Sequence, residues 1–430
     1  MIAEKAQYTS FDKVRVLQRK LYLSAKEKPS KRYGILYDKI FRMDILREAW
    51  CKVRDNRGSA GIDKVKIETI EDFGVSKYLR RLQEELKEET YSPKSIRRVY
   101  IPKDPSRTKM RPLGIPVVKD RIVQAAVKIV IEPILEADFQ DCSYGFRPKR
   151  KPHDAIRMVR RHIVNGYTNV IDADLKSYFD TIPHDNLMKV IKERISDPKI
   201  IRMIRGWLEA GIMEDEEITF TAEGTPQGGV ISPILANAYL NLLDRNWNEL
   251  GWSNKAKLVR FADDYVILTK GDPRPWYEKM RKLIERLELT LNEEKTEVVK
   301  AEDGFNFLGM HFRRKQSRKS KMWCYIWPSQ KAMKKIRHKI KGVTNRDYTP
   351  TVEEIVSKIN RKLIGWGNYF CFSNCAEHLI KLDNYVKQRI RIWLRRKHQK
   401  RGHGYRDYHV HFFERIKLYQ LSGQVKRLPF

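Results

Sequence analysis

Most apolar residues of the chain recur every three or four positions, which is the spacing of one buried helix face. Shorter runs rich in β-branched and aromatic residues have the composition of buried strands. Two such runs, Leu258–Val259 and Tyr265–Leu268, lie close together and predict a tight hairpin. The helical spacing predicts helices over 14–23, 43–53, 120–139, about 153–165, 184–195, 199–210, 232–249, 276–287, 351–363 and about 377–398.

Two adjacent aspartates, Asp263 and Asp264, stand between the apolar runs of this hairpin. An Asp-Asp pair in a protein is most often a solvated turn. Here the pair lies between core strands, where two like charges are costly unless positive charge compensates them. A divalent metal ion is the simplest source of that charge.

A second acidic segment covers Asn169–Asp180, and in an extended chain its Asp172 and Asp174 share one face. One carboxylate from this segment beside the hairpin tip would give three hard oxygen donors for two Mg²⁺ ions, with Mn²⁺ as a substitute. Two such ions ~4 Å apart stabilise the attacking and leaving oxygens of phosphoryl transfer. The acids therefore point to polymerase chemistry.

Eight sequence blocks resemble, in the same order, those of the group II intron reverse transcriptase/maturase family. They extend from about Lys52 to Phe312, and the basic helical segment after them resembles the family's thumb, or maturase, domain. The blocks are Arg97–Lys103, Arg111–Pro116, Ser143–Pro148, Asp172–Asp180, Gly224–Gly229 with Ser232–Asn237, Phe261–Asp264, Leu291–Thr296 and Phe307–Gly309.

The resemblance implies an α+β right-hand polymerase, with fingers, a palm that contains an antiparallel sheet, and a helical thumb. Four parts are expected. They are an N-terminal helical extension at 1–43, fingers and palm at 44–312, the basic thumb or maturase (X) domain at 313–401 and a short C-terminal tail at 402–430. No endonuclease domain is expected after the thumb.

By the family's pattern, Asp174, Asp263 and Asp264 are the expected catalytic and metal-binding residues. Asp174 lies five positions before Phe179, the aromatic residue at the sugar of the incoming nucleotide, and Asp172 is the alternative ligand. A bulky ring at position 179 would exclude a ribose 2′-hydroxyl by steric conflict. The product is therefore expected to be DNA, whereas an RNA-dependent RNA polymerase needs a small or polar residue there.

The resemblance also implies a dNTP-binding site made of Lys103, Arg111, Phe179, Gln227 and Lys295. The first two would hold the triphosphate, Gln227 would lie against the nucleotide, and Lys295 would lie near the leaving pyrophosphate. Each polar residue taken alone is more often an ordinary surface or turn residue. Template and primer contacts are expected at Arg147, Pro226, Gly228, Gly229, Leu308 and Gly309.

The charge balance indicates a polyanionic partner. Lys and Arg number 87 against 54 acids, a formal net charge of +33, and residues 313–401 hold 25 Lys and Arg against 5 acids. A charge run is usually a solvated face, but consecutive helices with surfaces of one sign repel each other unless they follow phosphates. The expected partners are a template RNA, most simply group II intron RNA, an RNA–DNA hybrid, a DNA primer and dNTPs.

Five scattered cysteines suit reduced thiols in a cytosol. Cys371 and Cys375, with His378 nearby, hint at zinc, but a structural zinc site needs four ligands and no second pair has a suitable spacing. No apolar run approaches the ~20 residues of a membrane span, and the first ten residues lack a signal-peptide core. A bacterial cytoplasmic protein without membrane contact is expected, and its oligomeric state stays open.

Two alternative functions belong to other classes. In the first alternative the chain is a non-catalytic maturase that only binds intron RNA and helps it to splice. In the polymerase interpretation, roles in splicing and retrohoming are expected in addition to catalysis. A domesticated relative would serve DNA repair or phage defence. The intact acids favour an enzyme, because a pure binding module has no use for three clustered carboxylates on a surface that meets phosphate.

Overall fold

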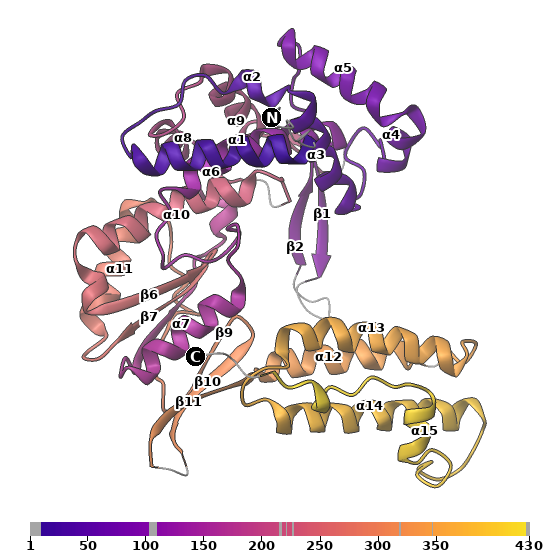
Figure 1. Cartoon of the computed structure of the whole chain (residues 1–430). Helices are drawn as coiled ribbons and strands as arrows, with labels where there is room; N and C mark the ends of the chain where they lie inside the picture. The colour runs from indigo at the N-terminus through magenta and orange to yellow at the C-terminus, as the bar shows by residue number, and fades with distance from the viewer. Residues whose placement is uncertain are drawn as a thin grey trace, which may run out of the picture. The chain divides into compact units, whose positions relative to one another are not determined.

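A computed structural model describes residues 10–102, 110–214, 217–220, 222–225, 228–317, 320–345 and 347–426 (Figure 1). The fold is α+β, as expected. The chain forms two compact units, each assembled from three segments. Unit 1 contains 1–151, 173–265 and 274–295, and unit 2 contains 152–172, 266–273 and 296–430.

The helical part of unit 1 is organised around α6 (Val118–Glu136). Helices α1 (Ser10–Glu27) and α3 (Met43–Asp55) pack against it. The sequence predicted one broad buried face for α6, whereas nearly all of its residues are buried, including polar Gln124. The other helices of this unit are α2 (Tyr37–Ile40), α4 (Ile67–Phe73), α5 (Val75–Lys87), α8 (His184–Lys192), α9 (Pro198–Leu208), α10 (Ser232–Glu249) and α11 (Arg274–Arg286).

A four-stranded sheet in unit 1 has the order β2-β1-β4-β5. Strands β1 (Ile96–Pro102) and β2 (Met110–Ile115) form a long antiparallel hairpin, visible in Figure 1 as two adjacent arrows. Strand β4 (Ile212–Glu214) pairs in parallel with β1 and antiparallel with β5 (Glu217–Thr219). Of the first two family blocks, the hairpin contains Arg97–Pro102 and Arg111–Ile115.

The acidic segments belong to a second sheet, ordered β6-β7-β3-β8. Strands β6 (Ala256–Phe261) and β7 (Asp264–Thr269) form the predicted hairpin. Strand β3 (Asn169–Ala173) pairs antiparallel with β8 (Glu297–Lys300) and ends earlier than the acidic segment, so Asp174 follows the strand. The boundary between the two units runs through β3 and β7.

Two sequence patterns predict helix caps: Thr351 to Glu354 is a capping box, and Ser232 before Pro233 predicts a serine cap with proline in the first turn. Thr351 caps α13 (Val352–Phe370), because its hydroxyl accepts from the backbone N–H of Glu354 and the Glu354 carboxylate accepts from the backbone N–H of Thr351, as predicted. The predicted serine cap of α10 is wrong. There Ile231 holds the cap position without a side-chain hydrogen bond, and Ser232 already lies inside the helix.

Unit 2 contains a three-stranded sheet, ordered β11-β10-β9, and helix α7 (Pro152–Val164) packs against β10 and β11. The strands are β9 (Phe305–Phe307), β10 (Met310–Gln316) and β11 (Met322–Pro328). Three long helices follow, α12 (Gln330–Val343), α13 and α14 (Ala376–Lys397), and then the short α15 (Val410–Arg415).

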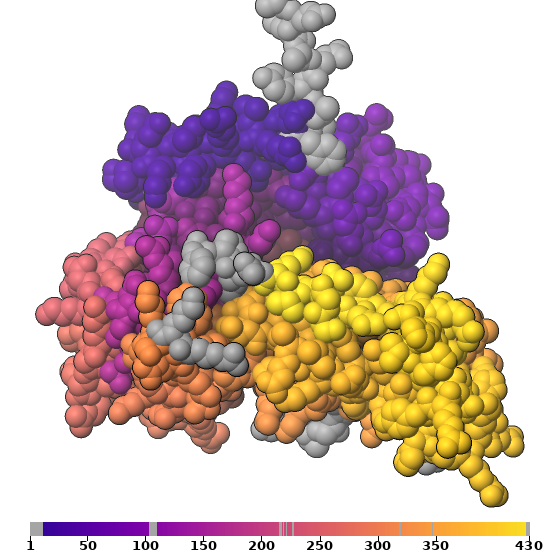
Figure 2. All heavy atoms as spheres, turned by 60° about the horizontal axis from the view of Figure 1, so that its bottom comes forward, coloured from indigo at the N-terminus to yellow at the C-terminus, as the bar shows by residue number. Residues whose placement is uncertain are grey.

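The C-terminal segment is part of the helical core of unit 2. Tyr408, Phe413 and Leu421 are buried in the same cluster as residues of α12, α13 and α14. Figure 2 shows this segment in yellow, lying over the helices. The expected boundary at 401/402 therefore does not separate a tail from the helical domain.

One arginine of α14 differs from its predicted position. The apolar spacing of this helix predicts that Arg391 faces outward and that Leu379, Leu382, Val386 and Trp393 face inward. Arg391 is instead buried, and its Nε donates to the carbonyl oxygen of Tyr408 (2.8 Å). Its guanidinium also lies over the ring of Phe413, 4.9 Å from the centroid. Arg391 therefore fastens the C-terminal segment. Leu379, Leu382, Val386 and Trp393 are buried, as predicted.

The cysteine pair that hinted at zinc lies in this apolar core. Burial raises the pKa of Cys371 to about 12 and that of Cys375 to about 11, which disfavours the thiolate that zinc binds. His378 stacks on Trp327, with 5.8 Å between ring centroids. These thiols are packing residues. Within the described ranges, no helix is sufficiently long and apolar to span a bilayer.

Because the C-terminal segment completes a core, Phe413→Ala is expected to lower the free energy of unfolding by ~3–5 kcal/mol. Phe413 is 0% exposed, whereas Val410 in the same helix is 52% exposed. Val410→Ala is the matched control and should change stability by no more than about 0.5 kcal/mol. Denaturant unfolding measures both, and equal losses would show that the segment is not part of the core.

Candidate active site

The β6–β7 hairpin presents two of the predicted aspartates. Its turn is Ala262–Asp263, with Ala262 in a left-handed conformation (φ 58°), and Asp264 is the first residue of β7. Asp263 is partly buried and Asp264 is exposed, while the rest of β7 is fully buried. The buried strand therefore anchors a tip that carries both carboxylates.

Asp174 is held by the segment that precedes β8. Its carbonyl oxygen accepts from the backbone N–H of Asn292 (2.8 Å), and its Oδ2 accepts from Asn292 Nδ2 (3.0 Å). The ammonium of Lys295 forms an ion pair with the same Oδ2 (2.6 Å). Leu175 pairs with Leu291 in an isolated bridge, which aligns the two segments. Two family blocks distant in sequence therefore meet at one carboxylate.

Four predicted site residues influence one another electrostatically. Burial raises the pKa of the Asp263 carboxyl, and the negative charge of Asp174 raises it further. The positive charges of Arg111 and Lys295 lower the pKa of the same carboxyl. The fold thus gathers Asp174, Asp263, Arg111 and Lys295 into one site.

The donor chemistry of this site fits a hard cation. Carboxylate oxygens are the ligands that Mg²⁺ prefers, and a cation would relieve the repulsion between Asp174 and Asp263. In this structure the ammonium of Lys295 already compensates Asp174. Over the described residues, no three His, Cys, Asp or Glu side chains are arranged as a ready metal-binding group. The three-aspartate ligand set therefore stays a prediction.

Phe179 lies in the short helix η1 (Tyr178–Asp180), which is fixed by the glycine-rich segment. The backbone N–H of Thr225 donates to the carbonyl oxygen of Phe179 (2.6 Å). The same glycine-rich segment also contacts β2. Gly228 has φ 122°, and a Cβ there would lie 2.2 Å from the carbonyl oxygen of Gly114 in β2. Only glycine fits this approach.

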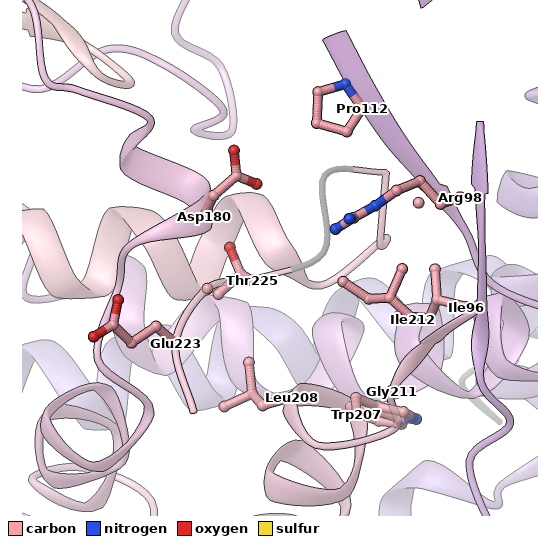
Figure 3. Close-up of a pocket in the computed structure, with 12 residues that line it drawn as sticks. Ile96, Arg98, Pro112, Asp180, Trp207, Leu208, Gly211, Ile212, Glu223 and Thr225 are labelled. Carbon is pink, nitrogen blue, oxygen red and sulfur yellow. The ribbon is translucent and has the colours of Figure 1, made fainter. Parts of the chain in front are cut away.

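A cavity of about 80 Å³ adjoins the Phe179 turn (Figure 3). Arg98 of β1 and Asp180 of η1 lie on opposite sides of it, and Trp207 at the end of α9 contributes an apolar wall. The guanidinium of Arg98 also pairs with Glu214 (3.4 Å). The cavity is thus lined by both polar and apolar groups, and its polar groups lie next to the turn that carries Phe179.

The structure corrects one predicted contact residue. Arg147 is buried, and its guanidinium donates to the Glu136 carboxylate (2.7 Å) and to the carbonyl oxygen of Ser143 (2.9 Å). A side chain so enclosed fixes the loop between α6 and α7 and is not placed to touch a template or primer. This burial was not predictable from the sequence, because a buried and a solvated arginine have the same local sequence pattern.

Several predicted residues lie elsewhere. Lys103, Pro226 and Gln227 fall outside the described residues. Gly229 is buried beside Gly228. Asp172 lies on β3 opposite Glu297, in unit 2. Leu308 and Gly309 form a left-handed turn in unit 2, where the Leu308 carbonyl oxygen accepts from the Tyr369 hydroxyl (2.9 Å).

Sequence reasoning missed Asn292 as a partner of Asp174. It was visible only as a member of the block Leu291–Thr296, in which Lys295 received the functional assignment. An asparagine in a loop is usually a turn residue, so nothing local distinguished it. Its role depends on a hydrogen bond to a residue 118 positions away.

The fold and these blocks define a polymerase-type domain followed by a helical domain. Residues 101–312 match the family described as reverse transcriptase (RNA-dependent DNA polymerase), and residues 333–410 match the group II intron, maturase-specific domain. The chain belongs to the group II intron reverse transcriptase/maturase family.

Three relatives illustrate the match. Protein YkfC of Escherichia coli is 38% identical over 345 residues, which cover 71% of this chain and 90% of YkfC. The group II intron-encoded protein LtrA of Lactococcus lactis is 32% identical over 345 residues, covering 66% of this chain and 57% of LtrA. An uncharacterized 91 kDa protein in the cob intron of Schizosaccharomyces pombe is 35% identical over 207 residues, covering 48% and 25%.

The charge of Asp263 should destabilise the ligand-free fold. Its folded-state pKa is raised, so ionisation above that pKa costs stability. Asp263→Asn is expected to raise the unfolding temperature at neutral pH, and the gain should vanish as pH falls through the raised pKa.

Asp185→Asn is the control with the opposite sign, because the hydrogen bond from Arg205 lowers the pKa of Asp185. That variant should be no more stable than the parent at neutral pH. Thermal unfolding from pH 4 to 8 measures both variants. A pH-independent effect of Asp263→Asn would show that its charge is not strained.

Proposed function

We propose that the chain is an RNA-directed DNA polymerase of the group II intron type, which extends a DNA primer with dNTPs on an RNA template. In this proposal residues 44–312 supply fingers and palm, and helices α12, α13 and α14, within 313–401, supply the thumb of a right-hand polymerase. The observation that carries it is the electrostatic coupling of Asp174 and Asp263 beside Lys295 and Arg111.

Each residue then has a task in the site. Asp174, Asp263 and Asp264 would hold two Mg²⁺ ions, which supply Lewis-acid stabilisation when bound. Both Asn292 and Lys295 act on Oδ2 of Asp174, so Oδ1 is the oxygen that would face an ion. The side chain of Lys295 is 65% exposed, so its ammonium would release Asp174 and pair with the leaving pyrophosphate instead.

The nucleotide would be held by groups outside the acidic cluster. Arg111 and Lys103 would bind the triphosphate, because their charged donors match phosphate oxygens. Phe179 would exclude the ribose 2′-hydroxyl, and Gln227 would lie against the nucleotide. Template and primer contacts remain proposed for Pro226, Gly228, Gly229, Leu308 and Gly309.

A maturase role is the second candidate, supported by the match of residues 333–410 to the maturase-specific domain. Helix α12 contributes a surface of one sign, since it contains no acidic residue. Such a surface favours binding to phosphates, so group II intron RNA is the proposed partner for splicing and retrohoming. The exposed lysines of α12 are Lys331, Lys334, Lys335, Lys339 and Lys341.

Asp263→Ala is expected to abolish primer extension on an RNA template and to leave RNA binding largely intact, because it removes a proposed metal ligand and no cation. Extension with labelled dNTPs and filter binding measure the two properties. Asp185→Ala, an exposed change, is the control and should extend normally. Extension equal to the parent by Asp263→Ala would refute the metal assignment. Persistent splicing by Asp263→Ala would assign splicing to binding alone.

Phe179→Ala is expected to admit ribonucleotides, because it removes the ring from the proposed 2′-hydroxyl position. The preference for dNTPs over rNTPs should fall by about 10-fold or more. Single-nucleotide incorporation kinetics with both substrates measure the preference. Phe220→Ala is the control, since Phe220 is 71% exposed. An unchanged preference in Phe179→Ala would remove the steric argument.

A further inference from the structure

Behind the hairpin tip lies a fully buried ion pair. Arg260 in β6 is 1% exposed and Asp244 in α10 is 0% exposed. The Nε of Arg260 donates to both carboxylate oxygens of Asp244 (2.9 and 3.1 Å), and its Nη2 donates to the same group. The pair therefore joins the strand that leads to the aspartates to a long buried helix.

The third nitrogen of the guanidinium, Nη1, binds the turn between β6 and β7. Nη1 of Arg260 donates to the carbonyl oxygen of Ala262 (2.9 Å) and to Oδ1 of Asn237 (3.1 Å). Asn237, also in α10, donates through Nδ2 to the carbonyl oxygen of Gly145 (2.7 Å). One side chain thus links the turn that precedes Asp263 to helix α10 and to a distant loop.

That loop closes on the turn from the other side. Tyr144 N–H donates to the Arg260 carbonyl oxygen, and Arg260 N–H donates to the Cys142 carbonyl oxygen (both 2.8 Å). A Cβ on Gly145 would lie 2.3 Å from the backbone nitrogen of Ala262, so glycine is required there. The left-handed Ala262 is therefore enclosed by backbone and by the Arg260 guanidinium.

Helix α10 also fixes the Phe179 turn. The hydroxyl of Tyr178 donates to the carbonyl oxygen of Ala236 (2.6 Å), one residue before Asn237. The turn before Asp263 is therefore bound to Asn237 through Arg260, and the turn that carries Phe179 is bound to the neighbouring residue Ala236. A displacement of either would change their relative placement.

Stability alone does not account for this pair. Removing two charges from water is expensive, and apolar side chains of similar volume are often equally stable or more so in such positions. What an apolar pair cannot supply is the directed hydrogen bond to the Ala262 carbonyl. A fully satisfied buried polar network selects one geometry.

We propose that Arg260, paired with Asp244 and Asn237, is the positioning residue that sets the placement of Asp263 in the site. Its effect on catalysis rests on the proposed polymerase function; its effect on the turn does not. Arg260 acts through the backbone and does not touch a substrate. The network should therefore control the rate of the chemical step more than the binding of nucleotide or primer.

The test replaces the pair with apolar residues, Arg260→Met together with Asp244→Leu, because either single change would leave a buried charge unpaired. The double variant is expected to fold, while kcat for primer extension falls about 100-fold, as a misplacement of about 1 Å can produce. The KM for dNTP and the affinity for primer–template should change little. Amide hydrogen exchange over Phe261 to Asp264 should become faster.

The control is Arg194→Met with Asp138→Leu, which removes a different ion pair of unit 1 (3.0 Å) that is less buried than the Arg260–Asp244 pair. It should leave kcat and the exchange of the hairpin turn unchanged. Loss of kcat in both double variants would indicate a general packing effect and would overturn the positioning role.

A second variant keeps the test decisive if the double variant does not fold. Arg260→Lys retains the charge opposite Asp244 but cannot also reach Asn237 and Ala262 with one ammonium. It should fold and lose most of kcat. Parent-level kcat and exchange in either variant would overturn the proposal. If the parent protein does not extend primers, the proposed polymerase function is wrong. Faster amide hydrogen exchange over Phe261 to Asp264 in the variants would still support the role of Arg260 in positioning the turn.

Discussion

The candidate site depends on one electrostatic constraint, the cost of an ionised Asp263 that is partly buried and feels the negative charge of Asp174. Asp174 follows strand β3 and Asp263 lies in the β6–β7 turn. Burial raises the pKa of Asp263, and the negative charge of Asp174 raises it further. Lys295 and Arg111 oppose this effect, and Lys295 pairs directly with Asp174. A site strained in this way is typical of functional centres, which trade stability for reactivity.

Maintaining two repelling acids requires a scaffold that does not relax. Helices α6 and α10 are buried over most of their length and hold the loops and turns that surround the acids. The polar residues inside this scaffold have their hydrogen-bond partners on other elements. Arg147 binds Glu136 of α6, and Arg260 of β6 binds Asp244 of α10. Buried polar groups without such partners would destabilise the fold, so these networks help to specify one arrangement.

Unit 2 follows a different principle. Its helices enclose an apolar core that the C-terminal segment completes, while many of its cations remain on the surface. Arg391 is an exception, because it is buried against Phe413 and the Tyr408 carbonyl. A core beneath the basic surface of α12, a helix without acidic residues, suits the proposed role of binding phosphates.

The sequence by itself determined ten of the helices, the acidic hairpin and the Thr351 cap, because periodicity and capping chemistry are local properties. It did not predict α2, α4, α5, α12 or α15. It also supplied the ordered blocks that identify the family. Only the tertiary structure decided that Arg147 and Arg391 are buried and that Asn292 and Lys295 bind Asp174. The physical reason is that a charged or amide side chain has the same local signature in water and in the interior, and its environment depends on partners far away in the chain.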